Sequence, residues 1–167
     1  MHQKSNTNLT EGSNMPNWIK GTLKLKGQSE NLKRFFKEGL EPSSWLGEEK
    51  PLCDYVNCYF NDDSCEVNFN NEPHVCDTRR AFITGDYVYW NEPYATVAIE
   101  IEQAWCFDAE SWQKIAKKYN LDIRLFGVEC GMEFCQKIEI IDGEITRNDE
   151  IKYDDWVWDC PMPLMGG

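Results

Sequence analysis

The sequence lacks any unbroken run of about 18 apolar residues, which is the length that a helix needs to cross a membrane. Its first fourteen residues are polar and do not contain the apolar centre of a secretion signal. We therefore expect a cytoplasmic protein, in the host cell cytosol, that does not contact membranes. Residues 1–14 are predicted to form a flexible leader, and the native start is either Met1 or Met15.

Sequence motifs for catalysis are also missing. The chain contains no glycine-rich phosphate loop, no dinucleotide-binding glycine pattern and no HExxH zinc motif. Histidine occurs only at positions 2 and 74. Acid pairs such as Glu100 with Glu102, or Asp154 with Asp155, would work as acid and base only if burial separated their pKa values. The sequence therefore predicts a protein that is not an enzyme and needs no cofactor.

The eight cysteines lack the spacing of a zinc motif, because no two of them are separated by only two residues. We favour buried, reduced thiols, since cysteine packs as a small apolar side chain and disulfides are rare in the cytosol. The alternative is a small enzyme or metal-binding protein that uses the Cys/His cluster at 53–76. Thiolate and imidazole groups are the usual zinc ligands. The residues of this cluster are Cys53, Cys58, Cys65, His74 and Cys76.

Positive charge is absent from residues 81–113, which contain six acidic residues and neither Lys nor Arg. Residues 139–160 hold eight acidic residues against Arg147 and Lys152, in a chain whose net charge is −12. Such a field repels phosphate backbones and attracts basic surfaces. The sequence therefore predicts no direct binding to nucleic acid and a basic host protein as partner. The alternative is that the acidity serves only solubility.

The segment YDDWVWDCPMPLMGG combines aromatic and acidic residues. We expect a strand at 150–158, which includes the first residues of this segment and places Trp156 and Trp158 on the same face. Tryptophan is enriched at the energetic centres of protein interfaces, so aromatics surrounded by acids suit a basic partner. The alternative is that both side chains fill the core. The predicted partner-binding residues are Glu92, Glu100, Glu102, Asp154, Asp155, Trp156, Trp158 and Asp159.

Hydrophobic periodicity indicates a β-α-β-β-α-β order that is followed by a hairpin, and Asp142-Gly143 is predicted to form a hairpin turn. We expect strands at 17–26, 81–90, 95–105, 121–130, 134–141 and 150–158, helices at 29–39 and 109–119, and an irregular insertion at 41–80. This order predicts an α+β fold, a ferredoxin-like antiparallel sheet with two helices on one face, extended by a C-terminal hairpin. Residues 15–167 suit a single domain by length.

Two segments resemble a known family. Residues 15–27, MPNWIKGTLKLKG, and the strand–helix–strand–turn segment at 95–136 are similar in order and spacing to the Api-ninety-two-like proteins. These are ferredoxin-fold proteins of phages, plasmids and genomic islands. The chain departs from the family at Ile19, where the family usually has Cys. The resemblance implies a ferredoxin-like fold and a mobile-element setting.

Charge and resemblance together lead to one functional hypothesis. We expect a non-enzymatic acidic binding protein of a phage or mobile element. It would inhibit a bacterial nucleic-acid-handling defence protein, such as a CRISPR effector or a restriction enzyme, by occupying a basic surface. A further alternative is an assembly subunit that forms a homodimer through a sheet edge.

Overall fold

The computed structural model describes residues 16–43 and 50–167, which form one sheet of eight strands and a second sheet of three. The predicted leader and the Met15 start lie outside these residues. The strands are β1 (Trp18–Gln28), β2 (Leu40–Glu41), β3 (Val56–Phe60), β4 (Cys65–Phe69), β5 (His74–Val75), β6 (Ala81–Ile83), β7 (Tyr87–Trp90), β8 (Tyr94–Ala104), β9 (Asp122–Glu129), β10 (Phe134–Ile141) and β11 (Glu144–Ile151). The helices are α1 (Ser29–Glu38), α2 (Ala109–Tyr119) and α3 (Trp156–Asp159), with a 3₁₀ turn, η1 (Leu52–Asp54).

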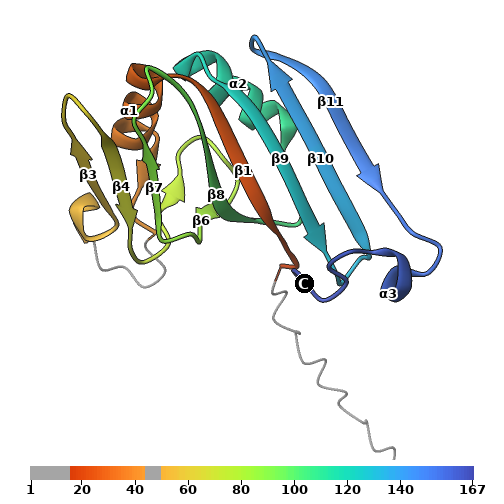
Figure 1. Cartoon of the computed structure of the whole chain (residues 1–167). Coiled ribbons are helices and arrows are strands. Elements are labelled where there is room, and N and C mark those ends of the chain that lie inside the picture. The colour runs from red at the N-terminus through yellow and green to blue at the C-terminus, as the bar shows by residue number, and fades with distance from the viewer. Residues whose placement is uncertain (1–15, 44–49) are drawn as a thin grey trace, which may run out of the picture.

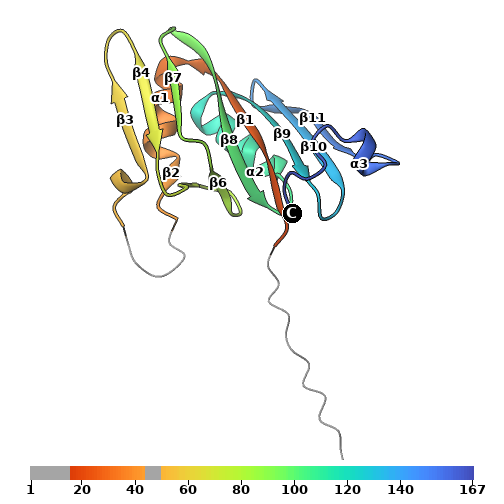
Figure 2. The same cartoon turned by 60° about the horizontal axis from the view of Figure 1, so that its bottom comes forward.

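Helices α1 and α2 lie on the same side of the strands and leave the opposite face of the sheet open (Figures 1 and 2). The large sheet has the strand order β11-β10-β9-β1-β8-β6-β5-β2, and every pairing in it is antiparallel. The small sheet has the order β3-β4-β7. None of the helices that the structure describes is long and apolar enough to cross a membrane.

Strand β1 forms the centre of the large sheet because its apolar residues alternate with lysines. Ile19, Leu23 and Leu25 are fully buried beneath the helices, whereas Lys20 and Lys24 point to the open face. The strand pairs along its whole length with β8 and over seven residues with β9. The alternation thus separates an apolar face, which packs on the helices, from a polar face, which stays in solvent.

Gly21 allows β1 and β9 to approach closely. A Cβ atom at this position would lie 1.9 Å from the carbonyl oxygen of Phe126 and 2.6 Å from Cα of Gly127. Both neighbours are backbone atoms, so no side-chain movement relieves the clash. Glycine is therefore required at this position by packing between two strands.

The helices bind the two sheets together through aromatic contacts. Phe35 of α1 contacts Tyr119 of α2 at a ring-centre distance of 5.4 Å. Phe36, also on α1, lies 5.8 Å from both Phe69 and Trp90 of the small sheet. All five rings are buried, so one core lies beneath both sheets.

The predicted α+β ferredoxin-like fold is wrong, because the chain is built mainly from strands. The described residues, 16–43 and 50–167, form eleven strands, whereas α1, α2 and α3 contain only 10, 11 and 4 residues. The fold implied by the family resemblance is corrected in the same way. The main cause is segment 41–80, which was expected to be irregular but contains β3, β4 and β5. Strand β4 pairs with both β3 and β7, and the rings of Phe69 on β4 and Trp90 on β7 pack against Phe36 of α1.

Two predicted strands are also corrected. The expected strand at 81–90 is divided at Gly85 into β6 and β7, which belong to different sheets. The amides of Thr84 and Gly85 both donate to the carbonyl oxygen of Glu100, and this shared acceptor interrupts the ladder. The expected strand at 150–158 is the end of β11 followed by helix α3. In contrast, the predicted turn at Asp142 and Gly143 is confirmed, with φ angles of 51° and 75° between β10 and β11.

Candidate partner-binding surface and pockets

Helix α3 separates the two tryptophans that were predicted to share a face. Asp155 caps this helix, and its Oδ1 accepts a hydrogen bond of 3.1 Å from the amide of Trp158. Because successive residues of a helix turn by about 100°, residues two apart point to nearly opposite sides. Trp156 is accordingly 6% exposed and Trp158 is 85% exposed. One of the two is therefore a core residue and the other a surface residue.

Trp156 fixes α3 to the open face of the sheet. Its ring packs in a small apolar cluster with Val128 of β9, Cys135 of β10 and Cys160. Its indole nitrogen donates a hydrogen bond of 2.9 Å to the carbonyl oxygen of Pro163. This bond joins the helix to the segment that follows it.

The segment after α3 is tied to the start of β1. The amide of Gly167 donates to the carbonyl oxygen of Trp18 at 2.9 Å, and the Cys130 thiol donates to the carbonyl oxygen of Gly166 at 2.9 Å. Gly166 has a φ of +83°, and a Cβ there would lie 2.3 Å from the carbonyl oxygen of Val128. Leu164, which is 88% exposed, is thus presented by an anchored backbone.

Acidic side chains surround this exposed apolar surface. Asp154, Asp155 and Asp159 are all exposed. Within residues 16–43 and 50–167, none of these three carboxylates forms an ion pair. Residues 153–167, which we call the C-terminal surface, therefore combine unpaired negative charge with exposed Trp158 and Leu164.

The other predicted binding residues lie elsewhere. Glu100 and Glu102 are on the open face of β8, and Glu102 forms an ion pair of 3.1 Å with Lys20. Only β1 lies between β8 and β9, which places Glu102 about 10 Å across the sheet from Val128, the nearer of the two strand residues that Trp156 contacts. Glu92 lies in the turn before β8, ten residues before Glu102. Glu92, at the other end of β8 from Glu102, therefore lies apart from the C-terminal acids.

The Cys/His cluster at 53–76 is dispersed over several elements. Cys53 is exposed in η1, Cys65 is buried on β4, and His74 pairs with Glu41 at 2.7 Å. Burial raises the pKa of the Cys58 thiol and of the Cys76 thiol, which favours the protonated form over a thiolate. No group of three or more His, Cys, Asp or Glu side chains in the described part of the chain is placed to hold a metal ion.

A pair of thiols that sequence reasoning did not connect lies beneath α3. The sulfur atoms of Cys135 and Cys160 are 3.9 Å apart, and both residues are buried. Burial, followed by the hydrogen bond and the charge of Cys160, raises the pKa of Cys135 from 9.0 to about 11. The Cys135 thiol is therefore uncharged at neutral pH, and both thiols pack in the apolar contact that holds α3.

We expect this pair to make stability depend on pH in alkaline solution. A pKa that is higher in the folded protein contributes stability that is complete below pH 9 and is lost as the pH rises toward 11. The free energy of unfolding should fall by roughly 2 kcal/mol more in the parent than in Cys135→Ala over this range. Denaturant unfolding at several pH values measures the difference. The same pH dependence in both proteins would contradict the assignment.

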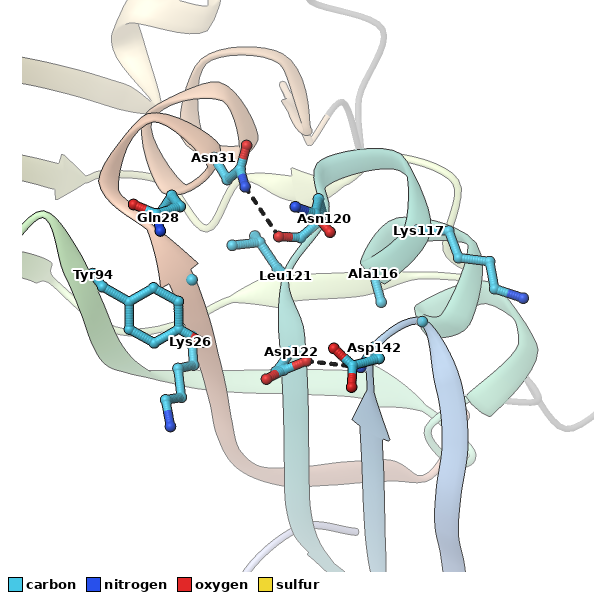
Figure 3. Close-up of a pocket in the computed structure, with 12 residues that line it drawn as sticks. Lys26, Gln28, Asn31, Tyr94, Ala116, Lys117, Asn120, Leu121, Asp122 and Asp142 are labelled. Carbon is cyan, nitrogen blue, oxygen red and sulfur yellow. Dashed lines mark hydrogen bonds between the residues drawn. The ribbon is translucent and has the colours of Figure 1, made fainter.

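The structure also has a polar pocket of about 390 Å³ (Figure 3). It lies where the end of β1, the start of α1, the end of α2 and the β10–β11 turn meet. Asn31 of α1 donates to the carbonyl oxygen of Asn120 at 3.1 Å, and the amide of Asp142 donates to Oδ1 of Asp122 at 2.9 Å. Lys26 and Tyr94 line the side formed by β1 and β8. Sequence reasoning missed this pocket because its lining comes from turns and element ends that are distant in the chain. Only the Asp142-Gly143 turn was a visible signal.

Comparisons with protein-family models, curated proteins and solved structures found no match to this chain. The similarity to the Api-ninety-two-like proteins therefore stays a prediction.

Proposed function

We propose that this protein is a cytosolic, non-enzymatic binding module that uses the C-terminal surface to bind a basic protein. The observation that carries the proposal is the exposure of Trp158 and Leu164, 85% and 88%, on an anchored segment whose three carboxylates form no ion pair with any described residue. Among the large apolar side chains that the structure describes, these two are the most exposed. Eight free cysteines suit a reducing compartment.

The exposed apolar residues and the acidic residues of the C-terminal surface act on binding in different ways: the first raise the affinity for a partner, and the second raise the rate of association. A tryptophan that enters a partner's pocket buries a large area and is a frequent energetic centre of an interface. Because the contacts of Trp156 and Gly167 already hold the backbone, binding orders little additional chain. The surrounding carboxylates attract basic surfaces before contact. Rigid apolar anchors and acidic surroundings thus favour a basic partner over an acidic one.

The partner class that we propose is a nucleic-acid-handling protein. Such proteins present basic surfaces that accept phosphate groups, and a set of fixed carboxylates can occupy the same positions. Binding at the C-terminal surface should then compete with nucleic acid for the partner. If the partner is a basic protein that binds equally well with and without nucleic acid, only the proposal of a basic partner stands, and the nucleic-acid-handling class is refuted.

Site-specific photocrosslinking tests the proposal directly. A photoreactive phenylalanine analogue replaces Val157, which is 73% exposed on α3, and separately replaces Tyr87, which is 64% exposed on the small sheet. In a bacterial lysate we expect a basic protein to crosslink through position 157 but not through position 87. Nucleic acid added to the purified partner should reduce this crosslink, because both would occupy the same basic surface. Identical adducts from both positions, or an adduct with an acidic protein, would refute the proposal.

The acidic residues should control the rate of association with this partner. Reversal of Asp154 and Asp159 to Lys leaves the helix cap Asp155 intact and should lower the association rate constant by about tenfold at low salt. The dissociation rate should change little. The matched control reverses Asp62 and Asp63, which are exposed in the β3–β4 turn. Stopped-flow or surface-based kinetics at two salt concentrations measure both rates. Equal effects of the two double variants would contradict a local role for the C-terminal acids.

A further inference from the structure

The open face of β1 carries positive charge at a distance from the C-terminal surface. Lys24 and Lys26 point to this face, two residues apart on one strand. The antiparallel register places Lys24 directly opposite Arg124 of β9, and Lys26 opposite Thr96 of β8. Like charges that face each other across two strands destabilise a sheet. This arrangement therefore costs stability unless an anion compensates it.

The protein's own acids compensate these cations poorly. Arg124 has its Nε 3.7 Å from Oε1 of Glu139, but the same oxygen lies 3.4 Å from Nζ of Lys137. In the part of the chain that the structure describes, the Lys24 ammonium forms no ion pair or hydrogen bond. Lys26 lies over the ring of Tyr94, 5.7 Å from its centre, and faces Asp122 of β9 in the strand register, but within the described residues no ion pair joins Lys26 to this carboxylate.

These cations line a cavity of about 260 Å³ on the open face, which is formed by Lys24, Lys26, Thr96, Asp122, Arg124 and Ile141. Ammonium, guanidinium and hydroxyl groups are the donors that bind phosphate oxygens, and guanidinium can bind two of them at once. Donors from three neighbouring strands thus converge on a volume large enough for a phosphoryl group.

The adjoining pocket in Figure 3 indicates what such a ligand carries besides phosphate. The two cavities share Lys26 and Asp122. Beyond these two shared residues, the pocket contains the carboxylate of Asp142 and the side-chain amide of Asn120. The carboxylate can accept a hydrogen bond from a hydroxyl group, and the amide can donate one to it. A ligand that places a phosphate against the cations and its hydroxyl groups against the carboxylates would use the donors and acceptors of both cavities. A bare anion would satisfy only one.

We propose that Lys24, Lys26, Arg124 and Thr96 bind the phosphoryl group of a small, hydroxyl-bearing phosphorylated molecule. The net charge of −12 does not prevent this, because charges farther away than about 8 Å are largely screened at physiological salt. The site is independent of the C-terminal surface, so either proposal can fail without the other. A long nucleic acid strand is disfavoured as the ligand, because it would extend past the cations to Glu100 and Glu102 of β8, which repel phosphate.

Calorimetric titration with ribose 5-phosphate, inorganic phosphate and ribose tests the site. We expect saturable binding of ribose 5-phosphate at millimolar concentrations or below, weaker binding of phosphate and none of ribose. The double variant Lys24→Gln, Arg124→Gln should weaken ribose 5-phosphate binding by at least about tenfold. Lys20→Gln is the matched control, because Lys20 lies on the same face of β1 and is already paired with Glu102. It should change the affinity less than about twofold.

Thermal unfolding of the free protein gives a second readout. Since Lys24 opposes Arg124, Lys24→Gln should raise the melting temperature by about 1 °C without ligand and remove most of the stabilisation that ribose 5-phosphate provides. Three results would overturn the proposal. These are no saturable binding of either phosphate compound, equal binding of ribose, or equal weakening by Lys20→Gln and the double variant.

Discussion

Trp156→Ala is expected to lower the free energy of unfolding by about 3 to 5 kcal/mol, the usual cost of truncating a buried tryptophan. The side chain is 6% exposed, packs against Val128, Cys135 and Cys160, and donates to the carbonyl oxygen of Pro163. Its removal leaves a cavity between α3 and the sheet and an unpaired carbonyl in the following segment. Denaturant unfolding, followed by circular dichroism, measures the change.

Trp158→Ala is the matched control for this experiment. The two residues share a helix and a residue type but differ in exposure, 6% against 85%. We expect Trp158→Ala to change the free energy of unfolding by less than about 0.5 kcal/mol, because exposed side chains contribute little. Equal destabilisation by both variants would show that Trp158 also packs in the protein, and the C-terminal surface would lose its anchor.

Several elements could be predicted from the sequence because their patterns are strong and local. Alternating lysines and apolar residues identify β1, and the apolar spacing of Leu32, Phe35 and Phe36 identifies α1. The cap Asp108 similarly marks the start of α2. In these elements the burial of one face agrees with the local periodicity.

The architecture could not be predicted as well, because it depends on short strands. Strand β4 alternates buried Cys65, Val67 and Phe69 with outward Glu66 and Asn68, yet it spans only five residues. Strands β3 and β7 are as short or shorter; the turn at residues 61–64 joins β3 to β4, and β5 and β6 of the other sheet lie between β4 and β7 in the chain. Such strands gain their stability from partners distant in the chain, here from α1, so a local pattern does not reveal them.

The candidate site was predicted only in part. The aromatic and acidic composition of residues 153–159 indicated a surface, but the strand interpretation gave Trp156 and Trp158 the same role. A capping signal was present, since Asp155 precedes the apolar turn, and it would have separated them. The position of Lys24 opposite Arg124 could not be foreseen, because strand register alone brings these two residues together.

The affinity of the crosslinked partner for Trp158→Ala tests the central claim most directly, with Tyr87→Ala as the matched exposed aromatic. Calorimetry or surface-based binding should show the dissociation constant rising by about thirtyfold for Trp158→Ala, which corresponds to roughly 2 kcal/mol for an interface anchor. The increase should come mainly from faster dissociation, and Tyr87→Ala should bind as the parent does. If both variants bind as tightly as the parent, the C-terminal surface is not the partner-binding site, and the account is contradicted.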